Sequence, residues 1–317
     1  YIYYGDVSVT TSTVAYSGSY GISVYNGALF ADAVTVRDNG ADGVYASGAA
    51  STAIISDSVL ANNGDSGLDV TNQVTITNST VISNTAAGIE LRPTSGIVTP
   101  TISGCTITNN AADAVYVNYN GGGGLPVLSA NTISGNGLDH AIVLGGNLGV
   151  SMTLTPDYPV GGAYVVRNLT AASGVVLTLD PSVVIKLADN GWLNVRGVLR
   201  VQGLAGSEVV FTSLADDTVG GDTNGDGGGT VPAPGDWQDI QLHSMAEVEM
   251  AHAAVRYGWR NFYAYAGGSR LTVDHTTITD GWGYGIYAGA GSTVTVTQST
   301  VEDNGAYGIY VYDGNLF

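Results

Sequence analysis

The residues best suited to do chemistry lie in a Gly-rich stretch between positions 215 and 236. Its oxygen-bearing candidate ligands are Asp216, Asp217, Asp222, Asn224, Asp226 and Asp236. Carboxylate and amide oxygens are the ligands that Ca²⁺ takes in proteins. Carboxylates this close together repel one another unless a cation or solvent separates them. We therefore expect the stretch to bind Ca²⁺ and to be ordered by it, and a metal-free solvated loop is the main alternative.

The spacing of three of these residues sharpens the expectation. Asp222, Asn224 and Asp226 alternate along the chain and Gly227 follows them, as in the first half of an EF-hand loop. The twelfth position of such a loop would be Ala233, so the usual bidentate Glu is missing. An outlying carboxylate from Asp216, Asp217 or Asp236 would have to replace it.

Other potential catalytic groups are dispersed along the chain. The four histidines have no metal-ligand spacing, and they are His140, His243, His252 and His275. The single lysine, Lys186, and the arginines are scattered, and Arg196 and Arg200 are the one close basic pair in the neighbourhood of the acidic stretch. The sequence therefore predicts no catalytic centre.

The elements that must position these residues form a repeat. The pattern V-T-V-x-x-S-T-V-x-x-N-G-x-x-G-I-x-V occurs at Val7–Val24, Gln73–Leu91 and Val294–Val311. An apolar residue that opens its third strand recurs at Ile22, Val44, Leu68 and Ile89, at spacings of 22, 24 and 21 residues. Each spacing holds three short strands with turns, and no single coil can bury its own apolar face. We predict an all-β solenoid of about 13 stacked coils, with parallel pairing between coils.

Asparagines recur at one turn of these coils. They follow an apolar residue of the second strand by three positions, at Asn39, Asn62, Asn84, Asn110, Asn136 and Asn304. Asn tolerates left-handed backbone angles, and its amide can bond to the same amide one coil away. The column therefore predicts a structural ladder. Cys105 has no partner for an internal disulfide and is expected to be a small core residue.

The regularity of the pattern changes along the chain. Residues 1–144 form regular short coils, residues 145–246 wider coils that carry the insertion at 215–236, and residues 247–317 short coils again. Strand-like alternation persists in the middle part, so we expect one continuous helix of coils over residues 1–317.

The coils resemble the right-handed parallel β-helix repeat proteins of the pectate-lyase-like superfamily. The middle segment resembles coils of large secreted and surface-attached bacterial proteins, in which V-x-G-x-L-x-x-x-G leads to V-x-F-T-S and an Asp/Gly-rich insertion. The resemblance implies a right-handed β-helix and an extracellular or cell-surface location. It says little about activity, because the superfamily contains lyases, hydrolases, epimerases, tailspikes, adhesins and structural rods.

The net charge and the surface residues limit the kinds of partner that the protein can bind. A net charge of −18 argues against nucleic acid, which requires clustered Lys and Arg, and no apolar run approaches the length of a membrane span. Four tyrosines directly follow the residue that opens the third strand and are expected to face outward, namely Tyr45, Tyr116, Tyr287 and Tyr310. They could contact a surface polysaccharide or stabilise the sheet through aromatic pairs.

The first and last coils are similar to each other. Val7–Phe30 and Val294–Phe317 share 15 of 24 residues without gaps, which predicts tandem repeats or end-to-end self-association. The expected function is an extracellular structural or adhesive rod with a structural calcium loop, as a segment of a surface fibre. A polysaccharide-lyase-like enzyme and a non-catalytic glycan-binding β-helix are the alternatives.

Overall fold

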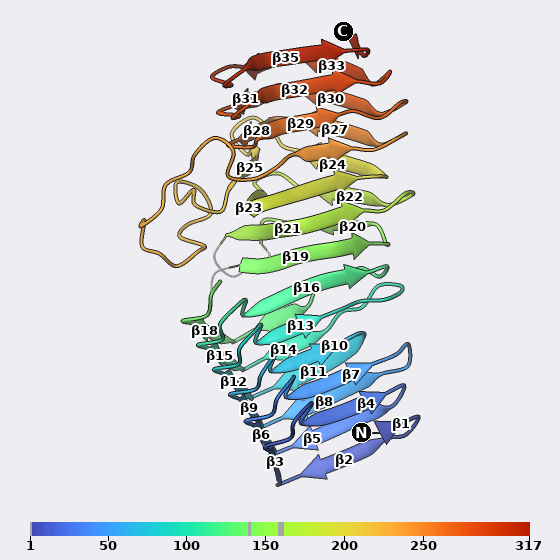
Figure 1. Cartoon of the computed structure of the whole chain (residues 1–317), viewed down its shortest axis with the longest axis vertical. Coiled ribbons are helices and arrows are strands. Elements are labelled where there is room, and N and C mark those ends of the chain that lie inside the picture. Colours follow the sequence, from blue (N-terminus) through green and yellow to red (C-terminus); the bar gives the residue numbers. More distant parts are fainter. Residues whose placement is uncertain (1, 139–140, 158–161) are drawn as a thin grey trace. The chain divides into compact units, whose positions relative to one another are not determined.

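The computed structural model describes residues 2–138, 141–157 and 162–317, and in this part of the chain all regular structure is β-strand. The strands form a parallel β-solenoid of about 13 turns, as the repeat predicts (Figure 1). Contacts divide the chain into two compact units, Tyr1–Asp139 (unit 1) and His140–Phe317 (unit 2). The prediction of one continuous helix over residues 1–317 stays a prediction. Among the described residues, no helix is long and apolar enough to cross a membrane.

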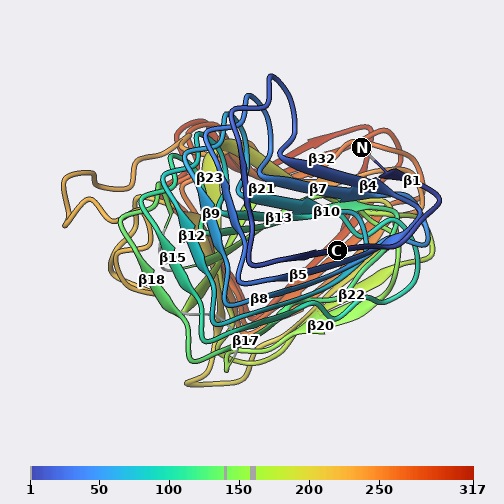
Figure 2. The same ribbon diagram turned by 90° about the horizontal axis from the view of Figure 1, so that it is seen from below.

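Unit 1 consists of coils with three strands each, and every strand pairs in parallel with its equivalent in the next coil. The first sheet contains β1 (Ile2–Tyr3), β4 (Ile22–Tyr25), β7 (Val44–Ser47), β10 (Leu68–Val70), β13 (Ile89–Leu91) and β16 (Val115–Asn120). The second contains β2 (Val7–Thr10), β5 (Ala28–Asp32), β8 (Thr52–Ser56), β11 (Gln73–Thr77), β14 (Thr101–Ser103) and β17 (Val127–Ser129). The third contains β3 (Thr13–Ala15), β6 (Thr35–Arg37), β9 (Val59–Ala61), β12 (Thr80–Ile82), β15 (Thr106–Thr108) and β18 (Thr132–Ser134). Figure 2 shows the strands of these sheets along three sides of the coil.

The register of the first sheet confirms the predicted period. Ile22 pairs with Val44, Val44 with Leu68, and Leu68 with Ile89. These side chains are buried, and Val44, Leu68 and Ile89 are fully inaccessible. Because side chains alternate along a strand, the same register puts the following residue of each strand on the outer face. Cys105 is buried, as expected.

The Asn column forms a continuous ladder in unit 1. The side-chain amide of each asparagine except the last donates to the amide oxygen of the next coil, at 2.8–2.9 Å. We call this set the amide ladder, and its members are Asn39, Asn63, Asn84, Asn110 and Asn136. From the second member on, the other Nδ2 hydrogen of each amide goes to a backbone carbonyl of an earlier strand, so both amide hydrogens are bonded.

The assignment of Asn62 to this ladder is wrong, because Asn63 occupies the position. Leu60, and not Val59, pairs with Val36 on one side and Val81 on the other. Val59 and Leu60 are adjacent and both apolar, so the sequence is compatible with either of them facing the core. The two alignments differ by one position. Asn62 is instead an exposed residue with φ 52°, the left-handed conformation that Asn tolerates.

Unit 2 has longer strands on one face and a separate sheet on the other. The long strands are β19 (Ala141–Leu148), β21 (Ala163–Ala171) and β23 (Val184–Val195). They are followed by strand pairs, namely β25 (Val209–Ser213) and β26 (Ile240–Leu242), β28 (Ala253–Arg256) and β29 (Arg260–Ala264), β31 (Thr277–Thr279) and β32 (Tyr284–Gly289), and β34 (Thr300–Val301) and β35 (Tyr307–Tyr312). The opposite sheet contains β20 (Met152–Leu154), β22 (Val176–Leu179), β24 (Val198–Gln202), β27 (Glu247–Ala251), β30 (Arg270–Asp274), β33 (Thr293–Thr297) and β36 (Asn315–Leu316).

The two ends of strand β23 pair with different strands of the sheet. Its first part, Val184–Leu187, pairs with β25, and its last part, Leu193–Val195, pairs with β26. The chain between β25 and β26 therefore leaves the coil and returns to the same sheet. This excursion carries the Asp/Gly-rich insertion, which Figure 1 shows as a long loop beside the strands.

Candidate functional site

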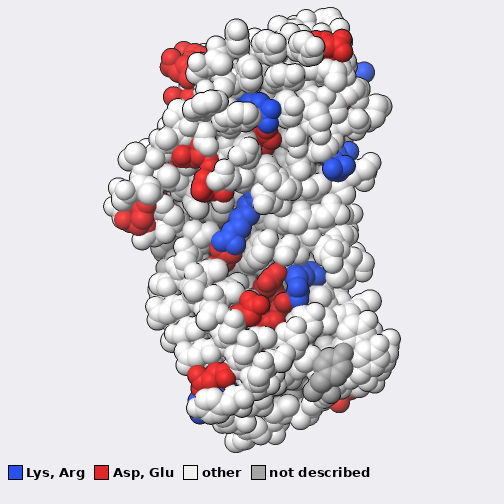
Figure 3. Space-filling model, viewed as in Figure 1, with Lys and Arg blue, Asp and Glu red and all other residues white. Residues whose placement is uncertain are grey.

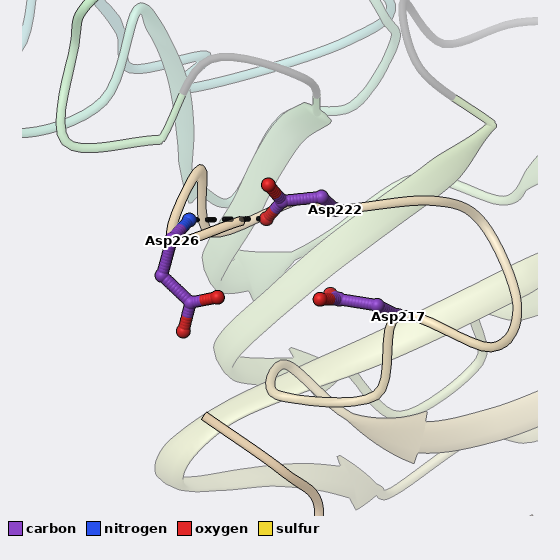
Figure 4. Close-up of side chains that lie close together, drawn as sticks. All are labelled: Asp217, Asp222 and Asp226. Carbon is purple, nitrogen blue, oxygen red and sulfur yellow. Dashed lines mark hydrogen bonds between the residues drawn. The ribbon is translucent and has the colours of Figure 1, made fainter. Parts of the chain in front are cut away.

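Three of the predicted calcium ligands lie together in the insertion. One carboxylate oxygen from each of Asp217, Asp222 and Asp226 lies within 4.8 Å of the others (Figure 4). We call these residues the acidic triad. In the described residues, it is the one group of three or more His, Cys, Asp or Glu side chains with this geometry.

The local sequence explains the shape of the loop around the triad. The Asp222 carboxylate accepts hydrogen bonds from the backbone N–H groups of Gly225, Asp226 and Gly227, at 2.8–3.1 Å. Gly225 and Gly227 have φ of 73° and 66°, a conformation in which Gly avoids the strain of a side chain. Asp226 repeats the arrangement with the three N–H groups of residues 228–230. The hydroxyl of Thr230, followed by these N–H groups, lowers the pKa of Asp226.

Two oxygen atoms near the triad have no hydrogen-bond partner. They are Oδ1 of Asp217 and Oδ1 of Asn224, and both are inaccessible to solvent. Desolvation, followed by the charge of Asp222, raises the pKa of Asp217. The Asn224 amide nitrogen donates to Asp226 at 3.0 Å, so its carbonyl oxygen is the free end. Buried oxygens without a hydrogen-bond partner are atoms that a hard cation could coordinate.

Lys186 lies at the base of the loop, which the sequence did not indicate. This side chain on β23 is fully buried, and its ammonium donates to the carbonyl of Gly221. Burial lowers the pKa of Lys186, while the charges of Asp217, Asp216 and Asp222 act in the opposite direction. The loop therefore already has one positive charge beneath its carboxylates, which offsets part of their repulsion.

Two of the predicted ligands are directed away from the triad. Asp216 is buried and forms an ion pair with Arg256 at 2.6 Å. Burial acts to raise the pKa of Asp216, but hydrogen bonds from Thr212 and Thr218 and the charge of Arg256 lower it. Asp236 accepts from the Ser213 hydroxyl at 2.6 Å and from the backbone N–H of Ala233 at 3.0 Å. Both residues fasten the ends of the insertion.

The predicted outward tyrosines of unit 1 are in register. Ser23, Tyr45, Asp69, Glu90 and Tyr116 occupy equivalent positions on consecutive strands of the first sheet. The ring of Tyr45 is engaged within the protein, since it stacks on Tyr20 at 4.6 Å and has the guanidinium of Arg92 over it at 5.5 Å.

Buried acidic residues beside Tyr45 were missed by the sequence reasoning. Burial raises the pKa of Asp42 to about 6 and that of Asp69 to about 8, although Arg92 pairs with Asp69 and lowers it. Sequence alternation places Asp69 on the outer face, but it does not reveal that neighbouring side chains cover it. On the face that Figure 3 shows, acidic groups lie next to basic ones, consistent with the ion pairs Arg92–Asp69, Arg256–Asp216 and Arg260–Asp239.

The predicted tyrosines of unit 2 belong to a larger aromatic group. Tyr287 and Tyr310 pair in register, and their ring centroids lie 5.6 Å apart. They contact further rings, which complete a cluster of Tyr263, Tyr265, Tyr284, Tyr287, Tyr307 and Tyr310. Two exposed tryptophans on nearby turns, Trp259 and Trp282, also stack on each other, and no sequence pattern singled them out.

Two comparisons with known proteins give no match and one gives a family. The model for the right-handed beta helix region matches residues 1–155 and 239–316. These two segments make up well over half of the chain and leave out the part that contains the acidic insertion. No curated protein and no solved structure matches the chain.

Proposed function

The chain belongs to the right-handed β-helix family, and on this basis we propose that it is a non-catalytic structural and adhesive β-solenoid of the cell surface. The observation that carries the proposal is the use of the buried polar residues. The side chains of the amide ladder bond one coil to the next. At another turn, the backbone N–H of buried Ser58 donates to the hydroxyl of buried Ser79 in the next coil at 3.1 Å. Such stacks favour a stiff scaffold over a site that must bind and release a substrate.

The arrangement of the basic residues argues against a polysaccharide lyase. Lys186 lies near acidic residues, but it is fully buried and its ammonium is bonded to a carbonyl, so a substrate could not reach it. Of the histidines, His252 stacks on His275 at 4.5 Å and His243 contacts Tyr265. None of these three belongs to the group that forms the acidic triad. His140 lies outside the described residues. A lyase needs an accessible base beside its acidic ligands.

A structural Ca²⁺ site in the insertion is part of the proposal. The support is the acidic triad together with the unpaired oxygens of Asp217 and Asn224. One carboxylate oxygen from each member of the triad lies within 4.8 Å of the others. Lys186 compensates one of the three negative charges, so a divalent cation would complete the neutralisation. The ion would order the insertion and take no part in a reaction.

Longer assemblies follow from the repeated coil sequence. The 15 identities between Val7–Phe30 and Val294–Phe317 support tandem repetition or self-association of such segments into a fibre. The acidic surface would keep neighbouring fibres apart by like-charge repulsion.

Two assays test the proposal as a whole. Incubation with polygalacturonate, alginate and xylan, with and without Ca²⁺, is expected to release no unsaturated or reducing sugar. A release that disappears in Asp217→Asn or Arg196→Ala would contradict the non-catalytic reading. Electron microscopy of the native material is expected to show filaments, and a population of compact monomers alone would contradict the fibre.

A further inference from the structure

The turns that carry Trp259 and Trp282 are stacked coil on coil in unit 2. Trp282 donates its backbone N–H to the carbonyl of Gly258 at 2.9 Å, and Gly305 donates to the carbonyl of Gly281 at 2.8 Å. This hydrogen-bond register makes Trp259, Trp282 and Gly305 equivalent positions in three successive coils. The third position has no side chain.

One face of the tryptophan pair is fixed by protein contacts. The indole centroids of Trp259 and Trp282 lie 5.8 Å apart with an angle of 20° between the rings. The guanidinium of Arg260 lies 4.6 Å from the centroid of the Trp259 ring and is held by an ion pair with Asp239 at 2.7 Å. The stack is thus ordered before any ligand arrives, which reduces the entropy cost of binding.

The other face of Trp282 is open. Its side chain is 59% exposed, an unusual state for the largest apolar residue, and Gly305 leaves the ring uncovered in the next coil. A cavity of about 520 Å³ lies beside it, lined by Pro234, Gly281, Trp282, Asp303, Gly305 and Ala306. A Cβ atom at Gly305 would lie 2.2 Å from the carbonyl oxygen of Trp282, so the backbone approach itself requires Gly.

We propose that this cavity binds a sugar ring of a neutral polysaccharide. A pyranose has one apolar C–H face, which suits a flat indole, and a rim of hydroxyls, which suits the Asp303 carboxylate and the backbone groups of the turns. No lysine or arginine lines the cavity, and its carboxylate together with the net charge of −18 repels uronic acids and sulfated sugars. The inference rests on the proposed adhesive function and names its ligand class.

The acidic insertion supplies one wall of this cavity. Pro234 belongs to the returning limb of the insertion, and Gly235, with φ 95°, lies so close that a Cβ there would be 3.3 Å from Cβ of Trp282. The wall and the acidic triad lie on the same excursion of the chain. Ordering of the insertion would therefore hold the wall in place, whereas the tryptophan stack stands without it.

The test measures binding by calorimetry and by tryptophan fluorescence with cellohexaose, xylohexaose, mannohexaose, trigalacturonate and tetramethylammonium. The full chain is expected to bind at least one neutral hexaose and to bind neither charged probe. Trp282→Ala should weaken this binding at least tenfold, and Trp282→Tyr should retain most of it. Phe30→Ala, which removes an exposed aromatic ring of unit 1, is the matched control and should bind like the wild type.

A second measurement uses the unaltered protein, so that it does not depend on how the variants fold. Saturating hexaose is expected to protect Trp282 from oxidation by N-bromosuccinimide, as read by peptide mass spectrometry. Binding of a neutral hexaose without this protection, or unchanged in a folded Trp282→Ala, overturns the site but leaves the adhesive function standing. Binding of tetramethylammonium or trigalacturonate alone overturns the ligand class. Binding of none of the probes overturns the site, and failure to adhere to any glycan or cell surface would remove the adhesive function as well.

Discussion

One turn of each coil is built differently in the two units. In unit 1 it lies between β6 and β7 and their equivalents, and the amide ladder fills it with buried side chains. In unit 2 the equivalent turns, between β28 and β29 and between β31 and β32, carry Gly followed by an exposed Trp. Two asparagines near these turns still pair, since Asn261 of β29 donates to Asn304, between β34 and β35, at 3.3 Å, but they do not form an unbroken column.

We infer from this difference that residues which stabilise the solenoid and residues which can contact a ligand lie in different units. A buried asparagine amide of the ladder stabilises the stack of coils only while the neighbouring amides are present to bond with it. Where the column is interrupted, no amide side chain ties the turn to its neighbours, and the turn can extend into an insertion or present a ring to solvent. We therefore expect substitutions in unit 1 to act on stability and those in unit 2 to act on ligands.

The largest loss of stability is expected when one asparagine of the amide ladder in unit 1 is replaced. Asn63→Ala removes bonds with both neighbours, at 2.9 Å each, and leaves their buried groups unpaired. The cost should be about 3 kcal/mol in the free energy of unfolding of unit 1. Chemical denaturation measures it. Asn62→Gly is the matched control, because the exposed, left-handed position suits Gly, and a change within about 0.5 kcal/mol is expected. Equal losses in both variants would contradict the corrected register.

A smaller change in stability is expected when a buried carboxyl of unit 1 is replaced. Burial raises the pKa of Asp42 from 3.8 to about 6, so the folded state favours the protonated form. The stability that this contributes is complete below pH 3.8 and is lost as the pH rises through about 6. Asp42→Asn keeps an acceptor for Ser66 and cannot ionise. Its stability relative to wild type should therefore improve by about 2 kcal/mol between pH 4 and pH 8. A constant difference across this range, measured by denaturation, would show that folding does not raise the pKa of Asp42.

The smallest expected effect concerns calcium in unit 2. Millimolar Ca²⁺ should stabilise the wild type by about 1–2 kcal/mol, and chelation should remove the gain. Asp217→Asn should abolish the response without loss of stability in the absence of the ion, since Asp217 lies beside Asp222 and its Oδ1 accepts no hydrogen bond. Asp57→Asn, at an exposed turn of unit 1, should respond like the wild type. An identical calcium response in Asp217→Asn and Asp57→Asn would place the ion elsewhere.

The sequence predicted the features that depend on the repeat period. It did not predict the features that depend on which side chains become neighbours in the fold. The spacing from Ile22 to Ile89 defines the register, because each inward residue has an equivalent one coil away. Asn63 was missed because Val59 and Leu60 are both apolar, and only pairing with Val36 and Val81 decides between them. Lys186, Trp282 and Asp42 have no local signature.

The candidate site was predicted in part for the same reason. The alternation of Asp222, Asn224 and Asp226 is local, and the structure brings two of these carboxylates together with Asp217. That Asp216 would turn to Arg256 depends on a residue forty positions away, which spacing alone does not reveal.

Hydrogen–deuterium exchange with and without Ca²⁺ tests most directly the claim that unit 1 is scaffold and the insertion of unit 2 is ligand-responsive. We expect millimolar Ca²⁺ to slow amide exchange in peptides from residues 215–236 and in those containing Trp282, whose turn contacts the returning limb. The peptides of the amide ladder should exchange equally slowly in both conditions. Equal exchange of the insertion with and without Ca²⁺, or a calcium effect as large in unit 1 as in unit 2, would contradict the account.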